Sequence, residues 1–216
     1  MAQTGEEEKE TGRLEAFSDG VFAIAMTLLI LDVKVPKPAD AAGAGGLFAA
    51  LGRQWPTYLA YLTSFATILV MWVNHHKLFR HIRRSDDAFL FLNGLLLLFV
   101  TSVPFPTSLV AEYLQRPEAR DASLLYAGTF VAIAIAFNLL WNYASRGGRL
   151  LGSRADRVEV KAITRQYRLG PVLYAVAVGL AFYSVAASLV LCLLLALFFA
   201  FTGSLSKLFG DSASGM

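Results

Sequence analysis

The chain has 216 residues, of which 56% are hydrophobic and only 16% are charged, whereas soluble chains are about one quarter charged. A soluble fold of this size would leave large apolar patches exposed, so the composition predicts a membrane protein. The net charge of +3 is small and dispersed, which argues against nucleic acid as a partner, and the single Cys192 excludes a disulfide framework and a thiolate metal site.

The two ends of the chain are polar. Residues 1–12 carry Glu6, Glu7 and Glu8 and lack the basic start and small-residue cleavage site of a signal peptide. We expect residues 1–12 to be a disordered acidic N-terminus and residues 209–216 a flexible C-terminal tail. Residues 13–208 between them are expected to form one transmembrane domain.

The first apolar window is short. Only the twelve residues Gly20–Leu31 are uncharged, between Asp19 and Asp32, and that is too few for a lipid-exposed span. The period is helical, and Glu15, Asp19 and Asp32 can enter a bilayer if protein or water surrounds them. The segment is therefore expected in the middle of a helix bundle, with an interfacial or buried soluble helix as the alternative.

The later windows are long enough to cross a membrane, which takes about 20 apolar residues. The uncharged windows are Gln54–Asn74, Ala88–Ala111, Ala122–Ser145 and Leu169–Ser206. The last is long enough for two spans, which we expect to be joined by a turn near residues 184–188. The sequence therefore predicts an all-α membrane protein with six transmembrane helices.

Positive charge is unevenly divided between the predicted loops. With six spans, 14 of the 19 Lys and Arg residues lie on the side of the N-terminus and 5 on the other side. This asymmetry follows the positive-inside rule and predicts that both termini are cytoplasmic. The cluster Arg80, Arg83 and Arg84 is expected to contact anionic lipid headgroups.

One face of the first helix is apolar. Positions Gly20, Ile24, Thr27, Leu28 and Leu31 share it, at the usual helical spacing. One interpretation is ordinary helix packing. The other is a hydrophobic constriction, in which rings of Ile and Leu around a narrow axis lose water and gate ion passage, with the Thr27 hydroxyl replacing part of an ion's hydration shell.

Asp19 is rotated away from that face and needs partners on neighbouring helices. Candidates at the same depth are Arg13, His75, His76 and Asn93. An alternative function follows from these residues: a proton-coupled small-solute or ion transporter that uses Asp19 and His75 as its relay.

Several other functions lack their motifs. The sequence has no nucleophile elbow, phosphate-binding glycine loop or paired-carboxylate motif, so we predict that it is not an enzyme. His75, His76 and His81 do not have metal-ligand spacing, and no cofactor is expected. No span carries the Lys or Arg repeat of a voltage sensor.

Three stretches carry specific motifs: Arg13-Leu-Glu-Ala-Phe17-Ser18-Asp19-Gly20 in the first helix, Trp72-Val-Asn-His75-His76-Lys-Leu-Phe-Arg80 ending the second span, and Asn93 through Pro104-Phe105-Pro106-Thr107 in the third. Over residues 13–110 they resemble the transmembrane protein 175 potassium channels. A single six-span repeat resembles the bacterial form of that family.

The resemblance implies a potassium-selective, leak-type channel in the bacterial inner membrane, with K+ as the permeant ion. It implies a homotetramer in which four first helices surround a central pore. In that arrangement Ile24, Leu28 and Leu31 form the constriction and Thr27 is the selectivity candidate. The polar network implied by the family consists of Arg13, Ser18, Asp19, Trp72, His75 and Asn93.

Overall fold

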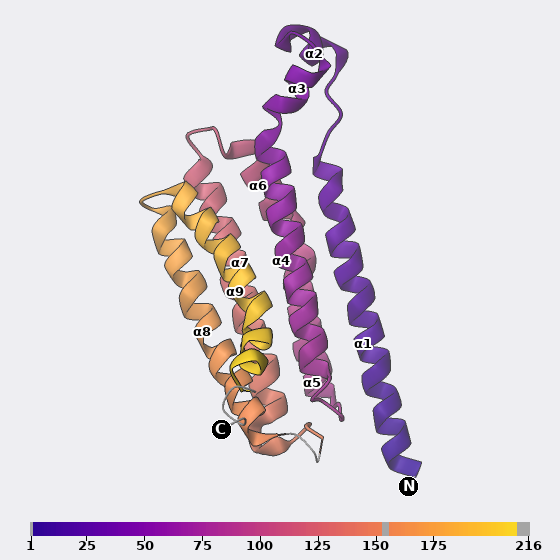
Figure 1. The fold of residues 1–216 in the computed structure, drawn as a ribbon. Helices are drawn as coiled ribbons and strands as arrows, with labels where there is room; N and C mark the ends of the chain where they lie inside the picture. The colour runs from indigo at the N-terminus through magenta and orange to yellow at the C-terminus, as the bar shows by residue number, and fades with distance from the viewer. Residues whose placement is uncertain (1, 153–155, 211–216) are drawn as a thin grey trace.

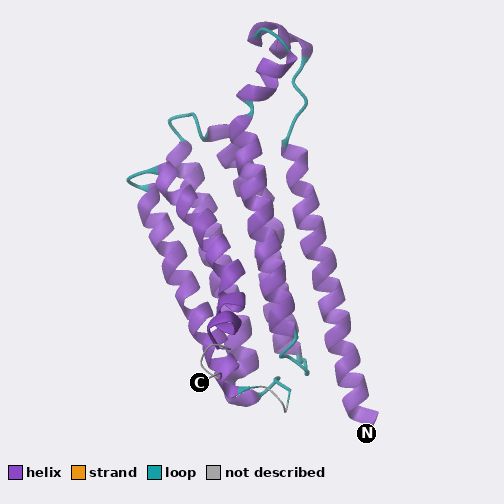
Figure 2. Ribbon diagram, in the orientation of Figure 1, coloured by secondary structure: helices purple, strands orange, loops and turns teal. Residues whose placement is uncertain are grey.

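The computed structural model describes residues 2–152 and 156–210, with side chains from 11 to 152 and from 156 to 200, and its secondary structure is helical (Figure 2). The elements are α1 (Ala2–Leu28), the 3-10 helix η1 (Leu29–Asp32), α2 (Pro38–Ala44), α3 (Leu47–Arg53), α4 (Trp55–Phe79), α5 (Asp87–Ser102), α6 (Pro104–Tyr113), α7 (Ala119–Ser145), the 3-10 turn η2 (Arg146–Gly148), α8 (Arg157–Ala181) and α9 (Val185–Gly210). Within the described residues the one β-bridge joins Ile82 to Leu151.

The long helices run side by side as a bundle, and the start of α1 and the end of α9 lie at the same end of it (Figure 1). Helix α1 lies at the edge of the bundle and packs on α4 and α5. Helices α2 and α3 project beyond the opposite end. The core is centred on α7, whose Tyr126, Phe130, Leu140 and Trp141 are almost completely buried.

Four of the six predicted spans are confirmed by length and composition. The described spans are Thr11–Asp32, Trp55–Phe79, Asp87–Tyr113 and Ala119–Gly148. Helix α8 carries charged residues in its first half, from Arg157 to Arg168, and the apolar part described for α9 is the shorter Val185–Ala200. The prediction of six spans is therefore confirmed for four helices, and the last two stay a prediction.

Prolines and capping residues set the helix boundaries. The third span is divided at Val103, because Pro104 begins α6 and has no N–H to donate to the preceding turn. Asp86 caps α5 by accepting a hydrogen bond of 2.9 Å from the Phe89 N–H. Helices α8 and α9 are joined at residues 182–184, a few residues before the predicted turn near 184–188.

The ends of the chain differ from the simple expectation. The backbone of α1 is already helical from Ala2, where the sequence analysis expects disorder over residues 1–12. Side chains are described only from residue 11 onward, and the disorder stays a prediction. The predicted flexible tail, residues 209–216, lies outside the described residues from 211 onward.

The α4–α5 and α7–α8 loops lie against each other at the end of the bundle where the N-terminus lies. The N–H groups of Arg83 and Arg84 donate to the Leu150 carbonyl, and the Gly152 N–H donates 3.1 Å to the His81 carbonyl. Arg149 Nη2 lies 3.3 Å from Asp86 Oδ2. The two basic loops, α4–α5 and α7–α8, are thus held together by hydrogen bonds and an ion pair and form one continuous surface.

Candidate pore-lining surface and polar network

Helix α1 has two distinct faces. Ser18, Phe22, Ala25 and Leu29 are completely buried, at the three- and four-residue spacing of one helix face. They pack against α4 and α5. The opposite face is left uncovered by the rest of the chain.

That uncovered face contains the residues predicted to line a pore. The exposed fractions are 57% for Ile24, 42% for Leu28 and 70% for Leu31, and Thr27 is also exposed. Three large apolar side chains on one uncovered helix face are unusual unless lipid or another protein surface covers them. Within one chain, therefore, these residues are not packing residues of the bundle.

The Thr27 hydroxyl has a defined orientation. Its Oγ1 donates a hydrogen bond of 2.9 Å to the Ile24 carbonyl. Because the hydroxyl hydrogen is used in this bond and Thr27 is exposed, the lone pairs of its oxygen remain available as acceptors. An exposed acceptor oxygen of this kind can contribute to the solvation of a cation.

Two side-chain contacts join α1 to α4. Trp72 Nε1 donates 2.8 Å to Asp19 Oδ1, and His76 Nδ1 lies 2.8 Å from Glu15 Oε1. The Trp72 and His76 rings are stacked, with centroids 6.2 Å apart. Asp19 is half-buried at the α1–α4 interface, and its carboxylate accepts a hydrogen bond there from the indole N–H of Trp72.

A second, fully buried chain of hydrogen bonds connects α4, α5 and α1. His75 Nε2 lies 2.9 Å from Asn93 Oδ1, Asn93 Nδ2 donates 2.9 Å to Ser18 Oγ, and Ser18 Oγ donates 2.8 Å to the Leu14 carbonyl. Because the amide oxygen can only accept, His75 Nε2 is the donor. None of these three side chains is more than 1% exposed.

The His75 ring also packs between aromatic side chains. Its centroid lies 5.3 Å from that of Phe22 on α1 and 4.4 Å from that of Phe79 on α4. The ring position and the hydrogen bond to Asn93 together fix the orientation of the imidazole.

Five of the six residues predicted for the network lie together, in two groups: Asp19 with Trp72, and Ser18 with His75 and Asn93. Arg13 does not join them among the described side chains and is exposed. It lies five residues before Ser18 and is thereby rotated by roughly 140°, which places it on the uncovered face. Asp19 and His75 have separate partners, so no direct hydrogen bond joins the two groups of the alternative relay.

The Glu15–His76 contact was not predicted from the sequence, although the spacing of the residues contains a signal for it. Glu15 and Asp19 are four residues apart on α1, and Trp72 and His76 are four residues apart on α4. On two antiparallel helices this equal spacing aligns both pairs at once. At the other end of α1, Asp32 Oδ2 accepts 2.6 Å from Ser108 Oγ, a partner that was also not predicted.

The described residues contain no group of three or more His, Cys, Asp or Glu that could hold a metal ion. Long apolar helices, an uncovered apolar face on the first of them and buried polar contacts behind it define an α-helical integral membrane protein.

Comparisons with known proteins identify its family. The sequence profile of "Endosomal/lysosomal potassium channel TMEM175" matches residues 13–104. A protein of Chamaesiphon minutus named as a potassium channel is 59% identical over 194 residues, which cover 90% of this chain and 95% of that one. A potassium channel of Streptomyces collinus is 50% identical over 193 residues, covering 89% and 92%.

The fold is similar to that of a solved relative. The crystal structure of a lysosomal potassium-selective channel TMEM175 homolog from Chamaesiphon minutus superposes with a TM-score of 0.82 at 56% identity, covering 89% of this chain and 97% of that one. The chain belongs to the TMEM175 family.

Proposed function

We propose that this chain is a subunit of a potassium-selective, leak-type cation channel, with K+ as the permeant ion and no enzymatic activity. The observation that carries the proposal is the uncovered apolar face of α1, with Ile24, Leu28 and Leu31 directed away from the chain's own bundle. Membership in the TMEM175 family supports the same function, since the Chamaesiphon minutus and Streptomyces collinus relatives of this chain are named potassium channels.

In the proposed channel four copies assemble around a central axis, with their α1 helices innermost. Rings of Ile24, Leu28 and Leu31 then form a hydrophobic constriction that disfavours water and so resists ion passage. Four Thr27 oxygens at the same level would replace part of the hydration shell of K+ and contribute to selectivity.

The network behind α1 is proposed to hold the pore helix in position. A helix that lines a constriction must keep a fixed orientation about its own axis. A rotation of about 100° would replace Ile24 at the constriction by the next residue along the helix. The Ser18–Asn93–His75 chain and the Asp19–Trp72 contact attach one face of α1 to two other helices. Arg13, on the uncovered face, is proposed to contact a neighbouring subunit.

We further propose that residues 13–208 form one transmembrane domain with six spans, in the inner membrane of a bacterium. The basic loops, the start of α1 and the end of α9 lie at one end of the bundle, and the positive-inside rule supports a cytoplasmic position for that end. Contact of that surface with anionic lipid headgroups fits the same orientation.

The proposal is tested by reversal potentials of the purified protein in planar bilayers under separate K+, Na+ and H+ gradients. The expected result is a reversal potential that follows the K+ gradient, with conduction that needs no counter-transported ion. Strict one-for-one coupling of K+ movement to protons would instead support the transporter that uses Asp19 and His75.

The variant Asp19→Asn separates these two mechanisms further. In a channel its main effect is on folding or assembly, because Asp19 accepts a structural hydrogen bond from Trp72. Correctly assembled Asp19→Asn protein should therefore still conduct K+, whereas a proton relay through Asp19 would lose transport.

A further inference from the structure

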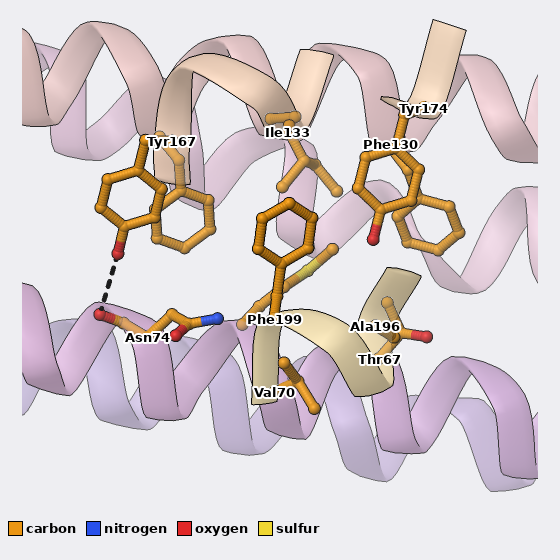
Figure 3. A pocket seen from close by; sticks show the side chains of 13 residues that line it. Thr67, Val70, Asn74, Phe130, Ile133, Tyr167, Tyr174, Ala196 and Phe199 are labelled. Carbon is orange, nitrogen blue, oxygen red and sulfur yellow. Dashed lines mark hydrogen bonds between the residues drawn. The ribbon is translucent and has the colours of Figure 1, made fainter. Parts of the chain in front are cut away.

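A cavity of about 50 Å³ lies on the other side of α4 from the polar network, between α4, α7, α8 and α9. It is partly enclosed, and Figure 3 shows the side chains that line it. The lining residues are Thr67, Val70, Met71, Asn74, Phe130, Ile133, Ala134, Phe137, Tyr167, Gly170, Tyr174, Ala196 and Phe199. The channel function proposed above does not use this cavity.

The walls of the cavity are aromatic. Tyr174 lies with its ring centroid 5.6 Å from that of Phe130 and 6.3 Å from that of Phe199, and the Phe137 and Tyr167 rings are stacked at 5.8 Å. No charged residue is among the lining residues. A charged ligand would therefore lose its hydration without gaining a counter-ion, whereas an uncharged apolar one would gain contact with the rings.

Two polar groups in this apolar lining have no partner in the described part of the chain. The side-chain amide of Asn74 points into the cavity (Figure 3), and Asn74 is only 8% exposed. The hydrogen bond of 3.4 Å from the Tyr167 hydroxyl goes to the Asn74 backbone carbonyl and leaves the side-chain amide unused. The Tyr174 hydroxyl also points into the cavity, with the residue 5% exposed. Buried polar groups are normally hydrogen-bonded, so each of the two groups requires an explanation.

We propose that this cavity binds the polar end of a small uncharged amphiphile, an apolar ring or chain that carries one hydroxyl or carbonyl oxygen. The oxygen accepts a hydrogen bond from Asn74 Nδ2 or from the Tyr174 hydroxyl, and a ligand hydroxyl also donates to Asn74 Oδ1. The cavity is smaller than the roughly 150 Å³ that encloses a whole benzene ring. The polar end therefore enters and the apolar remainder extends out of the partly open side, between the helices.

The test uses the purified full-length protein in liposomes and a photoreactive probe, an alkylphenol that bears a diazirine on the alkyl carbon next to its ring, so that the reactive group stays at the cavity when the phenol hydroxyl is bound. Mass spectrometry locates the labelled peptides, and the same alkylphenol without the diazirine serves as competitor. Labelling of lining residues of α4, α8 or α9 that saturates and is reduced by the competitor is the expected result.

Two variants and a matched control determine where the probe binds. Asn74→Leu keeps the size of the side chain and removes the amide, so labelling should fall about fivefold, the effect of losing one hydrogen bond. Gly170→Ala adds a methyl group that would lie 3.5 Å from Ala134 Cβ and 3.7 Å from Phe199 Cζ, an ordinary contact that narrows the cavity. Gly179→Ala adds the same methyl group to the same helix where nothing lies within 4 Å.

The proposal expects weaker labelling in Asn74→Leu and Gly170→Ala and unchanged labelling in Gly179→Ala. Equal labelling in all four proteins, or labelling only outside the cavity lining, would overturn it. The readout is binding and not ion flux, so this result is independent of whether the chain conducts K+.

Discussion

Asn93 is the side chain through which three helices are joined. Its amide oxygen faces His75 Nε2 on α4 and its amide nitrogen donates to Ser18 Oγ on α1, while the residue itself belongs to α5. Both the oxygen and the nitrogen of the amide are hydrogen-bonded, and only 1% of the residue is exposed. If Asn93 is replaced, His75 Nε2 and Ser18 Oγ therefore cannot form a hydrogen bond to water in its place.

We expect Asn93→Leu to lower stability by about 2–6 kcal/mol, since two buried polar groups, on His75 and Ser18, each lose one hydrogen-bond partner at about 1–3 kcal/mol. The measurement is the thermal unfolding midpoint in detergent. Thr101→Val on the same helix is the control, because Thr101 is exposed and bonds only the Leu98 carbonyl. A midpoint of Asn93→Leu no lower than that of the control would show that the network is not stabilising.

Asp86 gives a prediction with a pH dependence. Partial desolvation raises the pKa of this carboxyl, but the hydrogen bonds from the Phe89 N–H and the Tyr143 hydroxyl and the nearby Arg149 outweigh it, so the pKa lies below its usual value. A lowered folded-state pKa stabilises the protein above the unfolded pKa of about 4, and this stabilisation is lost as the pH falls through the folded value.

Asp86→Ala should therefore lower stability at neutral pH by about 0.5–2 kcal/mol, the usual effect of losing an N-cap. The difference from the unaltered protein should shrink as the pH falls below about 4. Unfolding midpoints at several pH values measure this. Asp86→Asn is the matched variant, since it retains a capping oxygen and loses only the charge; a pH-independent effect of Asp86→Ala would contradict the argument.

At the scale of single helices, α1 has one buried face and one face that the rest of the described chain leaves uncovered. Its buried face is fixed by packing, whereas Ile24 and Leu31 on its uncovered face are more than half exposed. Replacing Ile24, which is 57% exposed, should thus change unfolding within one chain by less than about 0.5 kcal/mol.

Ile24→Ala should instead change conduction. A smaller side chain widens the proposed constriction and lets hydrated ions pass, so the K+ over Na+ permeability ratio is expected to fall toward equality. Reversal potentials under mixed K+ and Na+ measure the ratio. Leu98→Ala, on α5 and 63% exposed, removes a similar surface side chain outside α1, and an equal effect of both variants would contradict a constriction at Ile24.

Most of the elements could be predicted from the sequence because uncharged windows directly reflect burial in a membrane. Helices α2 and α3 were not predicted, since each has only seven residues and a short helix leaves little periodicity. The sequence also placed the fifth span from Leu169, whereas α8 begins at Arg157, because a charge count cannot detect a helix that continues past the apolar region.

The candidate site was predicted less completely than the helices. The motif placed Ser18, His75 and Asn93 together, but which histidine bonds Asn93 depends on rotation about the α4 axis, and adjacent residues differ by about 100° in that rotation. The same limit explains Arg13, whose distance from Ser18 in sequence does not disclose that it lies on the uncovered face. Which side chains form hydrogen bonds between helices depends on how the helices pack, and this packing cannot be deduced from a single sequence.

At the scale of the whole molecule, a single chain leaves the uncovered face of α1 without a counterpart. Lipid could cover it, but lipid gives no reason for a hydroxyl on Thr27 or for a network that fixes the rotation of the helix behind it. If four copies assemble around one axis, the uncovered α1 faces of the four subunits point toward one another and cover each other. Cyclic symmetry then brings equivalent residues of different subunits close together.

Cysteine cross-linking tests that arrangement directly. In a Cys192→Ala background, Ile24→Cys and Leu31→Cys should form disulfide-linked dimers on oxidation in the membrane, because a narrow constriction brings equivalent residues within the roughly 4–7 Å Cα separation that a disulfide needs. Leu98→Cys, which has a similar exposure on α5, should remain largely monomeric on denaturing gels. Since Ile24 and Leu31 lie two helical turns apart, cross-linking of both places the whole stripe at the subunit contact. Monomer at both positions, with Leu98→Cys cross-linked instead, would assign the symmetry axis to another helix.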